Sequence, residues 1–117
     1  MKHAQVMHLE ATPGEKFRAG WERRILHTRD LMTVVIDVEG GPWAEADPLH
    51  SHPHEQISYL AEGEILFLAE GQEPVRMKTG DLFAVPSGVP HSIQLRSARA
   101  RLVDTFNPIR EDFLAQR

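Results

Sequence analysis

Short runs rich in β-branched and aliphatic residues recur along this sequence, separated by turns that contain Gly, Pro or Asp. The clearest run covers residues 31–38 and reads LMTVVIDV. Residues two apart in an extended chain point to the same side, so one face of this run is wholly apolar. That face consists of Met32, Val34, Ile36 and Val38. The run therefore predicts a strand with one buried face.

Further short runs follow, at residues 56–60, 64–68, 81–85, 91–96 and 101–105. Glu62-Gly63 separates the first two and predicts a tight hairpin, and residues 71–74 predict another turn. The only helix that the pattern favours is short, at residues 110–116, after Pro108. Many short strands with almost no helix are typical of an all-β sandwich or barrel.

Length and composition exclude several classes of protein. A chain of 117 residues suits a single domain, which we expect to span residues 1–117. It contains no cysteine, so disulfides, thiolate metal ligands and cysteine nucleophiles are excluded. The formal net charge is -4 and the basic residues are scattered, so no nucleic-acid partner is expected. The first residues lack the apolar core of a secretion signal, and no run is long enough to cross a bilayer. We expect a cytoplasmic location and no membrane partner.

The segment His50-Ser51-His52-Pro53-His54-Glu55-Gln56 carries the strongest chemical signal. His50 and His52 are two apart, so they face the same way and can share one metal ion. Gln56 has the same parity and opens the next predicted strand. His54 also shares it, but Pro53 interrupts the register, so we expect His54 at the rim. Imidazole nitrogen suits Ni, Zn, Mn, Co or Fe as divalent ions.

A second segment runs from Gly80 to His91 and reads GDLFAVPSGVPH. Its glycines permit tight turns, and its prolines stiffen the approach to His91. A strand-turn-strand of this kind can bring His91 towards the first histidine pair. The sequence thus predicts a divalent metal held by His50, His52, Gln56 and His91.

Together the two segments resemble the two motifs of the cupin superfamily. The first motif is matched by His50-x-His52, three residues, Gln56, six residues and a glycine, and the second by Gly80, Pro86-x-Gly88 and His91. The resemblance implies a double-stranded β-helix, a jelly-roll barrel with its core at about residues 30–107. Three departures stand out: Ala44 and Leu95 replace a usual glycine and asparagine, and Gln56 replaces the glutamate ligand.

The glutamine changes the expected chemistry. Three imidazoles and one amide are all neutral, so they leave the charge of a divalent ion uncompensated. Such a site should favour an anionic ligand, such as a carboxylate, and Lewis-acid rather than redox work. If the histidines bind nothing, Gln56 would only hydrogen-bond inside the barrel.

Residues 104–114, DTFNPIREDFL, resemble the tail of the pectin-degradation cupins, the KdgF family, as does the HSHPHEQ run. This resemblance covers about residues 25–114. It implies a metal enzyme that opens the ring of 4,5-unsaturated uronates, the monosaccharides left by pectate and alginate lyases, to linear keto sugar acids. The Asp, Phe and Arg group of the family matches Asp104, Phe106 and Arg110. It also implies a homodimer, formed by edge strands near the N-terminus.

Each of these three residues also has a plainer interpretation. Asp104 either moves a proton or pairs with Arg23 or Arg24 on a neighbouring strand. Phe106 either forms an apolar wall for a sugar or belongs to the core. Arg110 either grips a substrate carboxylate with two hydrogen bonds or serves the final helix. Two further functions stay open, a metal-dependent dioxygenase and a non-catalytic module that binds a small acid.

Overall fold

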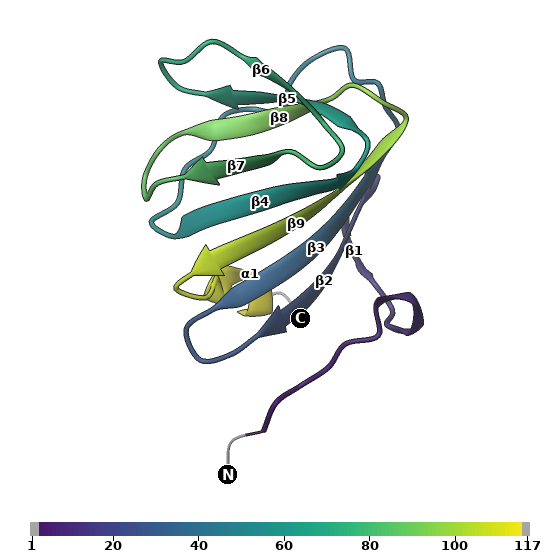
Figure 1. The fold of residues 1–117 in the computed structure, drawn as a ribbon, viewed down its shortest axis with the longest axis vertical. Coiled ribbons are helices and arrows are strands. Elements are labelled where there is room, and N and C mark those ends of the chain that lie inside the picture. Colours follow the sequence, from purple (N-terminus) through teal and green to yellow (C-terminus); the bar gives the residue numbers. More distant parts are fainter. Residues whose placement is uncertain (1–2, 116–117) are drawn as a thin grey trace.

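The structure is a computed structural model, and it describes residues 3–115. Nine strands and two short helices follow one another along these residues (Figure 1). In chain order they are η1 (Leu9–Ala11), β1 (Glu15–Arg18), β2 (Trp21–His27), β3 (Met32–Glu39), β4 (Glu55–Glu62), β5 (Glu64–Ala69), β6 (Val75–Lys78), β7 (Leu82–Val85), β8 (His91–Leu95), β9 (Arg99–Asn107) and α1 (Glu111–Ala115). Within this part of the chain, no helix is long and apolar enough to cross a bilayer.

The strands form two antiparallel sheets. The larger sheet has the order β1-β2-β3-β9-β4-β7, and the smaller has the order β6-β5-β8. In Figure 1 the larger sheet curls beneath the smaller one, and α1 lies near the end of β9. The prediction of an all-β jelly-roll barrel with a short C-terminal helix is confirmed. The predicted helix over residues 110–116 is observed as Glu111–Ala115, and Gln116 lies outside the described residues.

The inner face of the larger sheet supplies most of the core. The predicted apolar face of β3 is confirmed, since burial alternates along the strand. The buried side chains of this face are Met32, Val34, Ile36 and Val38. On the neighbouring strand β9, Ala100, Leu102, Asp104 and Phe106 point inward in the same alternation. A strand that buries one face thus fixes which residues can reach the interior.

The predicted hairpin at Glu62-Gly63 is wrong. β4 pairs with β7 and β9, whereas β5 pairs with β6 and β8, so this turn carries the chain from one sheet to the other. Gly63 has a positive φ of 95°, and a Cβ there would press against the carbonyl oxygen of Arg99. The glycine thus permits a close approach between backbones at the corner of the barrel. The turn expected at residues 71–74 does join two paired strands, β5 and β6.

Two strands precede those that the sequence pattern predicted. β1 and β2 extend the larger sheet beyond β3, so the sheet begins at Glu15. The run in β2, WERRILH, has no clean alternation of apolar and polar residues. Arg23 nevertheless points inward and is only 3% exposed, with Glu15 as an ion-pair partner at 2.8 Å.

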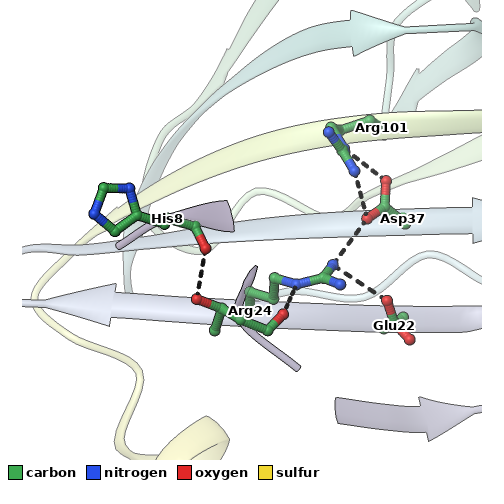
Figure 2. Close-up of polar contacts among 6 residues, drawn as sticks. His8, Glu22, Arg24, Asp37 and Arg101 are labelled. Carbon is green, nitrogen blue, oxygen red and sulfur yellow. Dashed lines mark hydrogen bonds and ion pairs between the residues drawn. The ribbon is translucent and has the colours of Figure 1, made fainter. Parts of the chain in front are cut away.

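The outer face of the larger sheet carries a network of charges (Figure 2). Asp37 accepts hydrogen bonds from Arg101 at 2.7 and 3.1 Å and from Arg24 at 3.3 Å. Arg24 also donates through Nε to the carbonyl oxygen of Thr12 at 2.6 Å, and the Thr12 hydroxyl donates to the carbonyl of His8 at 2.8 Å. This network holds the segment before β1 against the sheet.

Candidate metal centre and pocket

Three histidines from the two predicted segments meet at one end of the barrel. His91 is the first residue of β8, and His50 and His52 lie in the segment that leads into β4. Two backbone hydrogen bonds between His50 and His91, at 2.9 and 3.0 Å, fasten that segment to β8. One ring nitrogen from each of the three histidines lies within 4.8 Å of the others, so the group could hold a metal ion.

Backbone carbonyls fix the orientation of two of these rings. His52 Nδ1 lies 3.0 Å from the carbonyl oxygen of His54, and His91 Nδ1 lies 2.8 Å from that of Val89. A carbonyl only accepts, so each Nδ1 carries a proton, and each Nε2 keeps a lone pair. His91 Nε2 is buried and has no hydrogen-bond partner among the described residues. An unpartnered buried lone pair on a ring that lies beside two other imidazoles fits a cation.

The surroundings of the three rings favour their neutral form. Loss of contact with water is the main cause that lowers the pKa of the buried His52 and of the more exposed His50, and the positive charge of Arg110 adds to it. Burial lowers the pKa of His91 to about 4. At neutral pH the three imidazoles are therefore unprotonated, which is the form that binds a metal.

Gln56 lies beside the histidines, as the sequence predicted for a fourth ligand. Its Oε1 lies 3.0 Å from His52 Nε2. Both atoms present lone pairs, so neither can donate to the other. Two ligands of one ion, each about 2.1 Å from it and at right angles, lie about 3 Å apart. The spacing of these two acceptors therefore fits a shared cation.

The amide of Gln56 begins a chain of hydrogen bonds that ends at Asp104. Gln56 Nε2 donates to Ser58 Oγ at 2.9 Å, and Ser58 Oγ donates to Asp104 Oδ1 at 2.6 Å. Ser58 and Asp104 are direct partners across β4 and β9. The pairing with Arg23 or Arg24 that we considered for Asp104 is thus replaced by a bond to a serine.

Asp104 is a buried carboxyl group that accepts a hydrogen bond from Ser58. It is 6% exposed, and this burial raises its pKa from 3.8 to about 6. The Ser58 hydrogen bond and the charge of Arg110 oppose the increase without cancelling it. A carboxyl group with its pKa close to neutral can both accept and release a proton.

Phe106 and Arg110 lie with Asp104 around a pocket of about 360 Å³. This pocket is also lined by His50, Gln56 and His91. Phe106 is 2% exposed and meets the His52 ring edge to face at 5.7 Å, so it is both core and pocket wall. Arg110 donates to Asp112 of α1 at 2.9 and 3.4 Å and lies 4.0 Å above the ring of Phe113. Arg110 therefore both lines the pocket and contacts α1.

Three residues in and beside the pocket were not predicted from the sequence. Ser58 has the same parity as Gln56 on one strand, so the alternation alone could have placed it inside. Arg18 of β1 and Asp47 form an ion pair at the pocket, with hydrogen bonds of 2.6 and 3.0 Å. No local pattern joins these two residues, which lie 29 positions apart. His54, expected at the rim, is half-buried beside His52, with ring centroids 5.6 Å apart.

Comparisons with known proteins agree with this fold. The cupin domain family matches residues 34–106. The pectin degradation protein KdgF of Dickeya dadantii (strain 3937) is 35% identical over 107 residues, which cover 90% of this chain and 94% of that protein. The structure of KdgF from Halomonas sp. has a TM-score of 0.84 at 28% identity, over 93% of this chain and 99% of that one. A RmlC-like cupin from Shewanella frigidimarina NCIMB 400 has a TM-score of 0.83 at 35% identity, over 95% and 96%.

Proposed function

We propose that this chain, which belongs to the cupin family and within it to the family of KdgF, opens the ring of 4,5-unsaturated uronates. Its substrates would be the monosaccharides left by pectate and alginate lyases, and its products linear keto sugar acids. The observation that carries the proposal is one cluster of side chains, in which groups that could hold a metal ion lie with a buried carboxyl and an arginine around a pocket. The pocket is lined by His50, Gln56, His91, Asp104, Phe106 and Arg110, and His52 completes the group of three imidazoles beside Gln56.

The metal ligands in this proposal are His50, His52, His91 and Gln56. A divalent ion held there would act as a Lewis acid that polarises the oxygens of the substrate. The four side chains are neutral, so the ligand set itself favours an anionic substrate over a neutral one. Its mixture of imidazole and amide suits Ni, Zn, Mn, Co or Fe.

Asp104 is the proposed proton carrier. In the ring opening, the anomeric hydroxyl loses its proton and becomes an aldehyde while the bond between the anomeric carbon and the ring oxygen breaks. The ring oxygen leaves as the oxygen of an enolate, which becomes a ketone when a proton is delivered to the adjacent carbon of the former double bond. A carboxyl group whose pKa is raised to about 6 can perform either transfer near neutral pH. Its position on the wall of the pocket supports this role.

Arg110 is the proposed anchor for the substrate carboxylate. A guanidinium binds a carboxylate through two parallel hydrogen bonds, as Arg110 already does with Asp112. The side chain of Asp112 is 51% exposed, so this pair is easily exchanged for a substrate. The ring of Phe106, with the Arg110 guanidinium 5.3 Å above it, would provide an apolar wall for the sugar.

The decisive experiment supplies purified, metal-loaded protein with the unsaturated monosaccharide released by a lyase. We expect the absorbance of the conjugated double bond to decay faster than without protein, and His91→Ala to abolish the acceleration. Equal decay with and without protein would contradict the proposal. Saturable binding without decay would instead favour a non-catalytic acid-binding module, and oxygen consumption by iron- or manganese-loaded protein would favour a dioxygenase.

The homodimer and the cytoplasmic location also stay proposals. β1 is an edge strand of the larger sheet, so its free backbone groups can pair with a second copy. Sedimentation analysis at several protein concentrations would test the dimer, and a substitution of proline within β1 should weaken it if the edges pair.

A further inference from the structure

Ser58 lies between a proposed metal ligand and the proposed proton carrier. It is 0% exposed and bonds to Gln56 at 2.9 Å on one side and to Asp104 at 2.6 Å on the other. Its hydroxyl has a single proton, so it can donate in only one of these two directions. The direction in which the hydroxyl donates decides the direction of every hydrogen bond between Gln56 and Asp104.

The carboxylate at the far end sets this direction. An ionised Asp104 can only accept, so the Ser58 proton points to Asp104 and the Ser58 oxygen must accept from Gln56. Only the amide nitrogen of Gln56 can donate. Its Oε1 is then left facing His52 Nε2 at 3.0 Å, where a cation would need it.

The side-chain amide of Gln56 can also adopt the reversed orientation, with its nitrogen and oxygen exchanged. With the amide reversed, its nitrogen could donate to the lone pair of His52 Nε2, and that hydrogen bond would compete with a metal ion. Glutamate, the residue that the cupin motif usually has here, presents oxygen at both positions and has no wrong orientation. The substitution of Gln56 therefore creates a need for an orienting neighbour.

We infer that Ser58 is a positioning residue, which uses the negative charge of Asp104 to hold the Gln56 amide oxygen towards the histidines. The inference rests on the metal site of the proposed function but not on its reaction with uronates. It makes Asp104 a contributor to metal binding as well as a proton carrier, through one intervening hydroxyl. Groups that support metal ligands in this way typically change affinity by about 10- to 100-fold.

The test measures Ni²⁺ affinity by competition with a chromogenic chelator, with no sugar present. We expect Ser58→Ala to weaken Ni²⁺ binding by about 10-fold and Ser58→Thr, which keeps the hydroxyl, to stay within about two-fold of the wild type. The sharper comparison repeats Ser58→Ala in a Gln56→Glu background. There the serine has nothing to orient, so its removal should change the affinity by less than about two-fold. Circular dichroism spectra check that each variant folds.

The outcomes separate this inference from the proposed function. Unchanged Ni²⁺ affinity in Ser58→Ala, or the same loss in both backgrounds, would overturn the positioning role and leave the metal site intact. If Ser58→Thr does not fold, the Gln56→Glu comparison still decides. A wild-type protein that takes up no divalent metal would overturn both. A protein that shows the expected double-mutant result but does not consume the unsaturated uronate would overturn the reaction alone.

Discussion

Two aspartates on neighbouring strands of the larger sheet, Asp37 on β3 and Asp104 on β9, have opposite environments. Asp37 lies on the outer face between Arg24 and Arg101, close to water (Figure 2). Asp104 lies on the inner face, where the serine across the strand pair is its hydrogen-bond donor. Side-chain parity alone separates these surroundings, because alternate residues of a strand face opposite sides.

The difference shows which of the two carboxyl groups is available for chemistry. Ion pairs on a face in contact with water, such as the half-buried pairs of Asp37, contribute on the order of 1 kcal/mol and leave the carboxylate occupied. Burial at Asp104 instead raises the pKa to about 6 and leaves the group at the wall of a pocket. A carboxyl group that is costly to ionise and faces a cavity is a better candidate for proton transfer than a well-paired one.

The hollows on the two faces differ in the same way. The outer face has the larger one, about 500 Å³, lined by charged residues of both signs that include Arg24, Asp37 and Arg101. The inner pocket is smaller, about 360 Å³, but it contains two of the imidazoles and the buried carboxyl. Size alone would therefore select the wrong face, and the chemistry of the lining selects the right one.

The largest expected difference between the two aspartates is in the rate of the proposed reaction. Asp104→Asn keeps the shape but cannot exchange a proton, so we expect the rate of uronate ring opening to fall by about 10²- to 10⁴-fold. The matched substitution Asp37→Asn should stay within about two-fold of the wild-type rate. Both are measured by the decay of double-bond absorbance at neutral pH. Equal losses in the two variants would mean that Asp104 acts only through the fold.

The next effect concerns stability and pH, in chelator-treated protein. Burial raises the pKa of Asp104 from 3.8 to about 6, so the folded state holds this proton more tightly than the unfolded chain. Its contribution to the free energy of unfolding is full below about pH 4 and is lost as the pH rises to about 6. Over this pH range the free energy of unfolding of Asp104→Asn should therefore rise relative to that of the wild type, by on the order of 3 kcal/mol.

Urea unfolding of the two proteins at several pH values measures this gain. The lowered pKa values of the three histidines act in the opposite direction, but they do so in both proteins. The difference between wild type and variant thus isolates the carboxyl group. A difference that does not change with pH would contradict the raised pKa.

A metal should stabilise the inner face and leave the outer network untouched. An ion present at about 100 times its Kd adds about 2.7 kcal/mol, so a chelator should lower the Tm by on the order of 10 °C. His91→Ala should abolish this response, because it removes one of the three imidazoles that could hold the ion. Thermal unfolding with and without chelator gives the answer, and an unchanged Tm in the wild type would count against the metal site.

The smallest effect is expected on the outer face. Asp37→Asn removes the ion pairs with Arg24 and Arg101 and should cost about 1 kcal/mol or less in the free energy of unfolding. The cost should shrink somewhat at high salt, since charges in contact with water are screened over about 10 Å at 0.1 M ionic strength and half-buried ones less. Urea titrations at low and high salt measure it. A larger loss that salt does not reduce would mean that this network supports the fold more than its exposure suggests.

Several features of the protein follow from the sequence alone. The parity of His50, His52 and Gln56 is a local property of an extended chain, and it holds in the structure. The apolar alternation of β3 likewise predicted its buried face. These predictions succeed because a side chain's direction depends only on its immediate backbone.

Other features depend on which strands become neighbours, and only the tertiary structure decides that. Glu62-Gly63 predicts a hairpin, but the turn links two sheets, because strand pairing elsewhere determines where β4 and β5 lie. Asp104 could have met an arginine, yet it meets Ser58, which is 46 residues away in the sequence. Contacts of this kind arise from burying a shared core, and no local pattern encodes the partner. The proposed ligands were thus identifiable in the sequence, whereas the hydrogen bonds that link Gln56 through Ser58 to Asp104 depend on the fold.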